Sequence, residues 1–174
     1  MTKTRIIGTL ATTAFMTLIA PRALAQDRPA GTPAATKTRH WTAEEQELIG
    51  VVERFLEVAG KRDHDAMQAM LAPAAIVGRA NLSDGKWTGS ALSLEQYFSD
   101  TRNSPTVLAP YTETVQDYTI HVQDGQLAFV KADATFLPEG KPARNNIDFF
   151  TLIRLGGEWK FLSIAWVGKP LPGK

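Results

Sequence analysis

A single acidic residue in an apolar strand is the strongest chemical signal in this sequence. Asp148 lies within residues 145–153, a strand-length run that is apolar on both of its faces. An ionised carboxylate in an apolar sheet is unfavourable unless it is paired, hydrogen-bonded or protonated. Asp148 therefore marks either a buried structural hydrogen bond or the floor of a polar site.

The turn after this strand predicts which side chains share a face with Asp148. Gly156-Gly157 is typical of a two-residue hairpin turn, which would place Asp148 opposite Ala165 and Phe150 opposite Ser163. These small partners would leave empty space beside the carboxylate. The pairing therefore favours a ligand pocket over a packed core.

The turn before the strand allows two registers. A four-residue loop at 139–142 would place Asp133 opposite Asp148 and would turn Lys131 to the same face. A five-residue loop would turn Lys131 and Asp133 to the other face. We prefer the four-residue loop because it leaves the opposite face of the sheet uniformly apolar.

The preferred register gathers a group of titratable side chains. The Asp124-Gly125 turn would add Tyr118 beside Lys131, among Phe129 and Phe150. Two neighbouring carboxylates cannot both ionise cheaply, so one pKa should rise, and such a group can carry a proton near neutral pH. The candidate catalytic residues are Tyr118, Lys131, Asp133 and Asp148.

Helical patterns precede the strands. A capping box at 42–45 and an apolar stripe over 48–59 predict a long first helix, and shorter helices are expected at 65–71 and from Ser93. A strand is expected at 74–80, and four strand-length runs separated by turns follow the last helix. Helices before an antiparallel meander predict an α+β domain with the helices on one sheet face.

The N-terminus predicts export. Basic residues precede an apolar run at 6–20, and Ala23-Leu24-Ala25 is typical of a cleavage site, whereas an uncleaved anchor is the alternative. A Pro-, Ala- and Thr-rich stretch then precedes the domain. The expected organisation is a signal peptide (1–25), a flexible linker (26–41), the domain (42–169) and a tail (170–174) in a periplasmic or secreted protein.

The amino-acid composition limits the classes of binding partner that are expected for this protein. Cleavage removes three basic residues, so 16 Lys and Arg face 18 Asp and Glu, which predicts no nucleic-acid binding and no membrane association after signal cleavage. The chain has no cysteine and three scattered histidines, so no disulfide and no metal site are expected. The sequence carries no cofactor-binding motif, and we expect no cofactor.

Four segments carry a family resemblance: 51–55, 63–67, 147–150 and 157–161. With the order of elements over 44–168, they resemble the nuclear-transport-factor-2-like superfamily, especially its SnoaL-like and ketosteroid-isomerase-like branches. The resemblance implies a cone, in which a curved antiparallel sheet wraps around N-terminal helices and encloses an apolar pocket. The resemblance also implies an activity of the kind found in this superfamily, namely that of an isomerase, a dehydratase or a lyase.

The resemblance carries over only one isomerase residue. Asp148 falls on the protonated aspartate of ketosteroid isomerases, but Phe55 stands at the tyrosine position and the base position falls near Arg79. Steroid isomerisation is therefore not expected. A cofactor-free enzyme acting on a small apolar or aromatic molecule is expected instead; the alternative is a non-catalytic ligand-binding or protein-interaction module.

The remaining expectations concern the mouth and the outside of the cone. Arg79, Trp87 and Tyr97 are the expected mouth residues, and with Phe129, Phe150 and Ser163 they complete the substrate-binding candidates. The outer sheet face would expose an apolar patch too large for a typical soluble monomer, which predicts a homodimer. That patch would hold Val130, Ile147, Phe149, Ile153, Leu162, Ile164 and, as its anchor, Trp166.

Overall fold

The computed structural model describes residues 39–103 and 109–171, which fold as three helices and six strands. The elements are α1 (Ala43–Gly60), α2 (His64–Met70), β1 (Leu71–Ser83), β2 (Lys86–Ser93), α3 (Leu94–Asn103), β3 (Tyr111–Gln123), β4 (Leu127–Pro138), β5 (Arg144–Leu155) and β6 (Glu158–Pro170). This confirms the α+β prediction. The predicted signal peptide, most of the linker and most of the tail lie outside the described residues.

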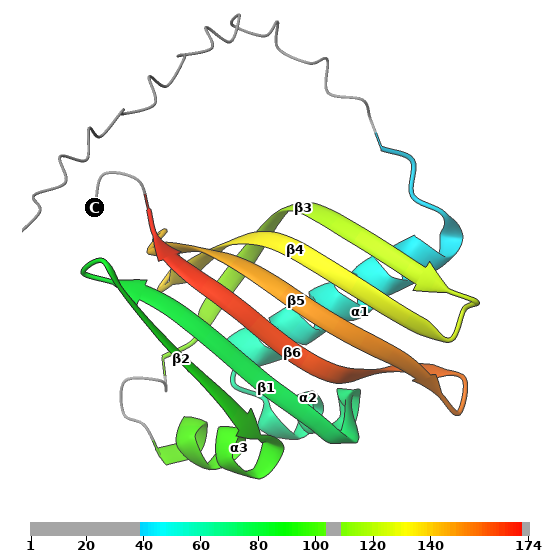
Figure 1. Cartoon of the computed structure of the whole chain (residues 1–174), viewed down its shortest axis with the longest axis horizontal. Helices are drawn as coiled ribbons and strands as arrows, with labels where there is room; N and C mark the ends of the chain where they lie inside the picture. The colour runs from blue at the N-terminus through cyan, green and yellow to red at the C-terminus, as the bar shows by residue number, and fades with distance from the viewer. Residues whose placement is uncertain (1–38, 104–108, 172–174) are drawn as a thin grey trace, which may run out of the picture. The chain divides into compact units, whose positions relative to one another are not determined.

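The strands form one sheet in the order β2-β1-β6-β5-β4-β3 (Figure 1). Neighbouring strands are antiparallel except for β1 and β6, which are parallel. The fully antiparallel expectation fails at this pair because the β3–β6 meander returns beside β1 in the same direction. No helix in the described part of the chain has the length and apolar character that a bilayer crossing requires.

Helix α1 provides the core against which the sheet packs. The predicted capping box begins it: the Thr42 hydroxyl accepts from the Glu45 N–H, and the Thr42 N–H donates to the Glu45 carboxylate. Its apolar stripe, including Leu48, Val52 and Phe55, is buried. The helix crosses the sheet on the side shown behind the strands in Figure 1.

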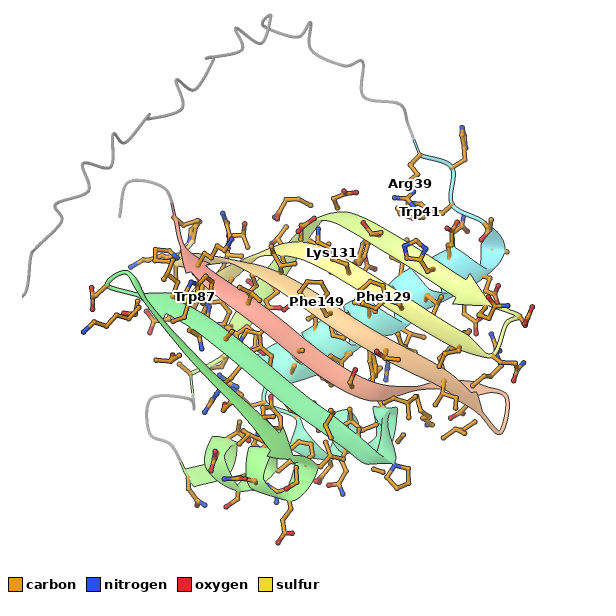
Figure 2. The ribbon with its side chains drawn as sticks, in the orientation of Figure 1. Arg39, Trp41, Trp87, Phe129, Lys131 and Phe149 are labelled. Atoms are coloured by element: carbon orange, nitrogen blue, oxygen red, sulfur yellow. The ribbon has the colours of Figure 1, made fainter. Side chains whose placement is uncertain are left out.

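The last residues of the predicted linker pack against the domain. Figure 2 shows Arg39 and Trp41 together, with the Arg39 guanidinium 4.1 Å from the centre of the Trp41 ring. Arg39 also donates to the Tyr118 carbonyl oxygen, and the Trp41 ring meets the Tyr118 ring edge-on at 6.4 Å. Arg39 and Trp41, at the end of the predicted linker, thus contact the folded domain, while residues 26–38 of that linker lie outside the described residues.

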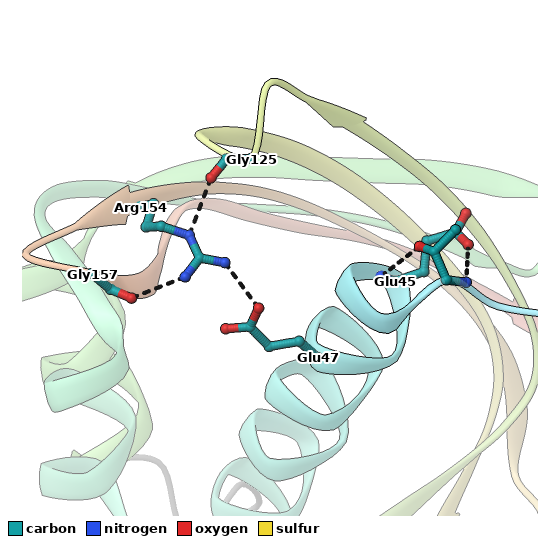
Figure 3. Close-up of polar contacts among 6 residues, drawn as sticks. Glu45, Glu47, Gly125, Arg154 and Gly157 are labelled. Carbon is teal, nitrogen blue, oxygen red and sulfur yellow. Dashed lines mark hydrogen bonds and ion pairs between the residues drawn. The ribbon is translucent and has the colours of Figure 1, made fainter.

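Arg154 joins the helix to two hairpin turns (Figure 3). Its guanidinium donates to the carbonyl oxygens of Gly125 and Gly157, both at 3.1 Å, and to the Glu47 carboxylate at 2.8 Å. The same group stacks on the Trp159 ring at 4.6 Å. One planar cation thus fixes this end of the sheet on α1.

Gly60 allows α1 to approach β3, and Gly60→Ala is expected to lower the free energy of unfolding by about 1–3 kcal/mol. A Cβ at Gly60 would collide with the Tyr111 carbonyl oxygen. Gly50→Ala is the matched control, because a Cβ at Gly50 meets nothing within 4 Å. Removing this exposed helical glycine should stabilise the protein by up to ~1 kcal/mol. Urea denaturation of both variants tests the contrast, and equal effects would contradict it.

Candidate functional site

A cavity of about 360 Å³ lies between the helices and the inner face of the sheet. Phe55, Met67 and Phe150 form part of an apolar floor. The polar side chains are numerous for so small a space. They are Arg62, Arg79, Asn81, Glu113, Arg144, Asn146 and Asp148, together with the hydroxyls of Tyr97, Thr101 and Tyr111.

Strand register places Asp148 in the middle of a row of cavity residues. On β5, Asp148 lies opposite Trp166 of β6, which in turn lies opposite Arg79 of β1. All three side chains line the cavity. The row therefore presents a carboxyl group, an indole and a guanidinium from three adjacent strands.

A second row lies one pleat away. Asn146 lies opposite Gly168, which lies opposite Asn81. A Cβ on Gly168 would lie 2.7 Å from the Asn81 Oδ1 atom and 3.4 Å from the Asn146 Oδ1 atom. The glycine thus leaves the space in which the two amide side chains face the cavity.

Asp148 and Glu113 form a coupled pair of carboxyl groups. Burial, the charge of Glu113 and a hydrogen bond with Glu113 together raise the pKa of Asp148 to about 8, against the influence of Arg144. Burial also raises the pKa of Glu113. As a carboxylate, Asp148 would have a buried Oδ2 atom that accepts no hydrogen bond from the described residues. As an acid it can donate a hydrogen bond, and the raised pKa keeps Asp148 mostly protonated at neutral pH.

A hydrogen-bond chain orients the Glu113 carboxylate. Arg144 Nε donates to Asn146 Oδ1 at 3.0 Å, and Asn146 Nδ2 donates to Glu113 Oε1 at 2.7 Å. The order is fixed because a guanidinium only donates and a carboxylate only accepts. Arg144 thereby turns the donor end of the Asn146 amide toward Glu113.

Two aromatic rings separate two arginines along the cavity wall. The Arg62 guanidinium lies 4.7 Å from the centre of the Tyr111 ring, and that of Arg144 lies 4.3 Å from the centre of the Phe136 ring. The two ring centres are 4.7 Å apart. Stacking holds the flat faces of the guanidinium groups and leaves their N–H edges available to other partners.

The structure removes Lys131 and Asp133 from the cavity. Asp148 lies opposite Ala132, and Lys131 lies opposite Phe149, which is the register of the five-residue loop. The preference for the four-residue loop is therefore wrong. Lys131 and Asp133 form an ion pair at 2.6 Å on the outer face, where Figure 2 shows Lys131 near Phe129 and Phe149.

Three substrate-binding candidates also lie outside the cavity. Phe129 is 38% exposed on the outer face. Ser163 lies opposite Thr151 rather than Phe150, because a β-bulge shifts the β5–β6 register between Thr151 and Leu152. Trp87 is 54% exposed, and it lies opposite Leu82, which is out of phase with the cavity-facing side chains of β1.

The other candidates lie on the inner face. Asp148, Phe150, Arg79 and Tyr97 line the cavity, while their roles in binding or catalysis stay predictions. Tyr118 is buried against Trp41 and does not line the cavity. Burial and the Glu53 charge raise the pKa of its hydroxyl, which disfavours a role in proton transfer.

The same register changes the predicted dimer surface. Trp166 and Ile164 line the cavity and Val130 is fully buried, so none of them can anchor an outer contact. Ile147 and Phe149 remain on the outer face. A homodimer through that face stays a prediction, without Trp166 as its anchor.

Sequence reasoning missed Arg62, Glu113 and Arg144. Arg62 has a φ of 63°, which is unusual for a residue other than glycine. Nothing in the local pattern of Glu113 marks it as a cavity residue, because its strand neighbours are exposed threonines. Among the described residues, no group of three or more His, Asp and Glu side chains could hold a metal ion.

The comparisons with known proteins agree with this architecture. A family model described as "Putative lumazine-binding" matches residues 43–167. No functionally curated protein matches the sequence.

Solved structures similar to this chain include several nuclear-transport-factor-2-like (NTF2-like) proteins. One of unknown function from Shewanella baltica is 20% identical and has a TM-score of 0.51 over 76% of this chain and 100% of that one. Another, from Cytophaga hutchinsonii, is 11% identical, with a TM-score of 0.58 over 73% and 99%. A third, from Pseudomonas putida, is 17% identical, with a TM-score of 0.55 over 73% and 87%. The chain belongs to the family described as "Putative lumazine-binding", and it has the fold of the NTF2-like proteins.

Proposed function

We propose that this protein binds a small molecule with an aromatic or apolar body in its cavity and transfers a proton on it without a cofactor. One observation carries the proposal: Asp148 and Glu113 are coupled carboxyl groups in the wall of a cavity with an apolar floor. Groups whose pKa values are shifted by burial and by a specific partner are typical of acid–base sites.

The two carboxyl groups would take different roles. Glu113, held by Asn146, would accept a proton from a carbon of the substrate. Asp148, protonated at neutral pH because its pKa is about 8, would deliver a proton to a developing oxyanion or leaving group. Isomerisation, dehydration and carbon–carbon cleavage all need this pairing of base and acid.

The second candidate function is binding without chemistry. The family description favours it, because lumazine is a flat heteroaromatic molecule and the cavity is lined by Tyr97, Tyr111 and Trp166. Carboxyl-carbon NMR titration separates the two functions. A pKa of Asp148 in the ordinary range would favour binding over proton transfer.

A generic carbon acid tests the catalytic proposal before a natural substrate is known. In 5-nitrobenzisoxazole, Glu113 would take the ring C–H proton, the N–O bond would break to give a nitrile and a phenolate, and Asp148 would donate a hydrogen bond to the developing phenolate oxygen. Asp148→Asn and Glu113→Gln are each expected to lower kcat/KM by about 10²-fold or more. The coloured nitrophenol product reports the rate.

Asp133→Asn is the matched control, because Asp133 is a carboxylate on the outer face of the same sheet. It should leave the rate unchanged. Wild-type rates in both cavity variants would overturn the proposed function.

A further inference from the structure

The cavity carries more positive charge than its acidic pair can balance. Arg62, Arg79 and Arg144 line it, against Glu113 and Asp148. Three guanidinium groups face two carboxyl groups, and Asp148 is mostly protonated at neutral pH, so the formal charge of the lining is positive. The ion pairs of residues 39–103 and 109–171 involve other cations, and none of these three arginines takes part.

Besides Asp148 Oδ2, two buried polar atoms of the wall have no hydrogen-bond partner among the described residues. Arg62 Nε and Asn81 Oδ1 are buried. The Arg62 Nε–H donates to no described residue, and the Asn81 oxygen accepts from none. A buried polar atom without a partner destabilises the fold. Both side chains line the cavity, so a ligand there could supply the missing partners. The guanidinium of Arg79 has one side-chain hydrogen bond, from Nε to the Ser90 hydroxyl at 3.0 Å.

Arg62 stands where helices usually place glycine. The Arg62 N–H donates to the Ala59 carbonyl and the Asp63 N–H to the Val58 carbonyl, which is the hydrogen-bond pattern of a Schellman motif. The residue at this position takes a left-handed conformation, and Arg62 has a φ of 63°. Glycine adopts it without strain. The helix end itself therefore gives no reason for an arginine, whereas the cavity does.

Arg62, Arg79 and Tyr97 all line the cavity. Burial raises the pKa of the Tyr97 hydroxyl, and the positive charges of Arg62 and Arg79 both act against that rise. The two guanidinium groups come from the end of α1 and from β1, and both line one cavity of about 360 Å³. The paired N–H groups of an arginine side chain match the spacing of two oxygen atoms in a carboxylate or phosphate.

We propose that the ligand of this cavity is an organic anion, with an aromatic or apolar body and a carboxylate or phosphate group held by Arg62 and Arg79. The inference rests on the proposed function only in placing the ligand in the same cavity. The volume, at the lower end for ligand pockets, restricts the body to one or two rings.

Isothermal titration of the full chain with three related probes tests the proposal. The probes are 2-naphthoate, 2-naphthyl phosphate and the neutral 2-naphthamide. At least one anion should bind about tenfold or more tightly than the amide, and the tighter anion identifies the charged group. Arg62→Gly should lower the ratio of anion affinity to amide affinity toward one.

The variants separate charge in the cavity from charge on the surface. Arg79→Gln should also weaken anion binding, and its exposed position keeps the fold intact. Arg54→Gln is the matched control, since it removes an exposed guanidinium of α1 outside the cavity, and it should change no affinity. The 5-nitrobenzisoxazole assay is a separate measurement on the same protein, so a failure of proton transfer can be told apart from a failure of this inference. Equal affinity for amide and anions, no binding of any probe, or unchanged anion affinity in Arg62→Gly would overturn it.

Discussion

Asp148→Asn is expected to raise the free energy of unfolding at pH 8 and to leave it nearly unchanged near pH 4. In the folded protein the pKa of Asp148 is raised from 3.8 to about 8, chiefly by burial. The folded state therefore holds a proton that the unfolded chain releases above about pH 4. Stability attributable to this group is present at low pH and declines as the pH rises from 3.8 toward 8.

The size of this effect follows from the shift. Each unit of pKa difference corresponds to about 1.4 kcal/mol, so the wild type should lose on the order of a few kcal/mol between pH 4 and pH 8. An amide at position 148 does not ionise, so the variant should not show this loss. Glu113 remains in the variant and, because burial raises its pKa as well, part of the pH dependence persists.

Urea denaturation between pH 4 and pH 8 measures the difference. Asp133→Asn is again the control, because Asp133 is paired with Lys131 on the outer face. Parallel pH profiles for the wild type and Asp148→Asn would show that Asp148 ionises normally in the folded protein. The raised pKa of Asp148, and the catalytic roles that depend on it, would then be abandoned.

Phe161→Ala is expected to lower the free energy of unfolding by about 3–5 kcal/mol. Phe161 is fully buried, and its ring centre lies 4.7 Å from that of Phe55 and 5.5 Å from that of Phe150. Removing it would open a cavity between α1 and the two central strands. The surrounding backbone is fixed by sheet hydrogen bonds and can relax only in part.

Phe129→Ala is the matched control on the opposite face of the sheet. Phe129 is 38% exposed, so its truncation should cost about 0.5 kcal/mol in the monomer. Thermal or urea unfolding of both variants gives the comparison. A loss in Phe129→Ala as large as that in Phe161→Ala would mean that the two faces of the sheet have been exchanged.

The local sequence pattern is sufficient to predict the class of fold and most of the helices and strands. The capping box at Thr42 and the apolar stripe of α1 involve neighbours within a few residues, so both can be read from the chain. The Gly156-Gly157 turn is predictable for the same reason, since positive φ angles at both glycines suit a two-residue hairpin. The burial of Asp148 also follows from its apolar neighbours in sequence.

The composition of the site depends on register, which local pattern does not determine. Side chains alternate between the two faces of a strand, so one extra residue reverses the assignment of all that follow. The β-bulge beside Thr151 places Trp166 rather than Ala165 opposite Asp148. The register of the five-residue loop before β5 turns Lys131 to the outer face. Both features depend on how β5 pairs with its neighbouring strands, which is a tertiary property. The tertiary structure also brings Arg62 and Glu113, which are far apart in the chain, to one cavity.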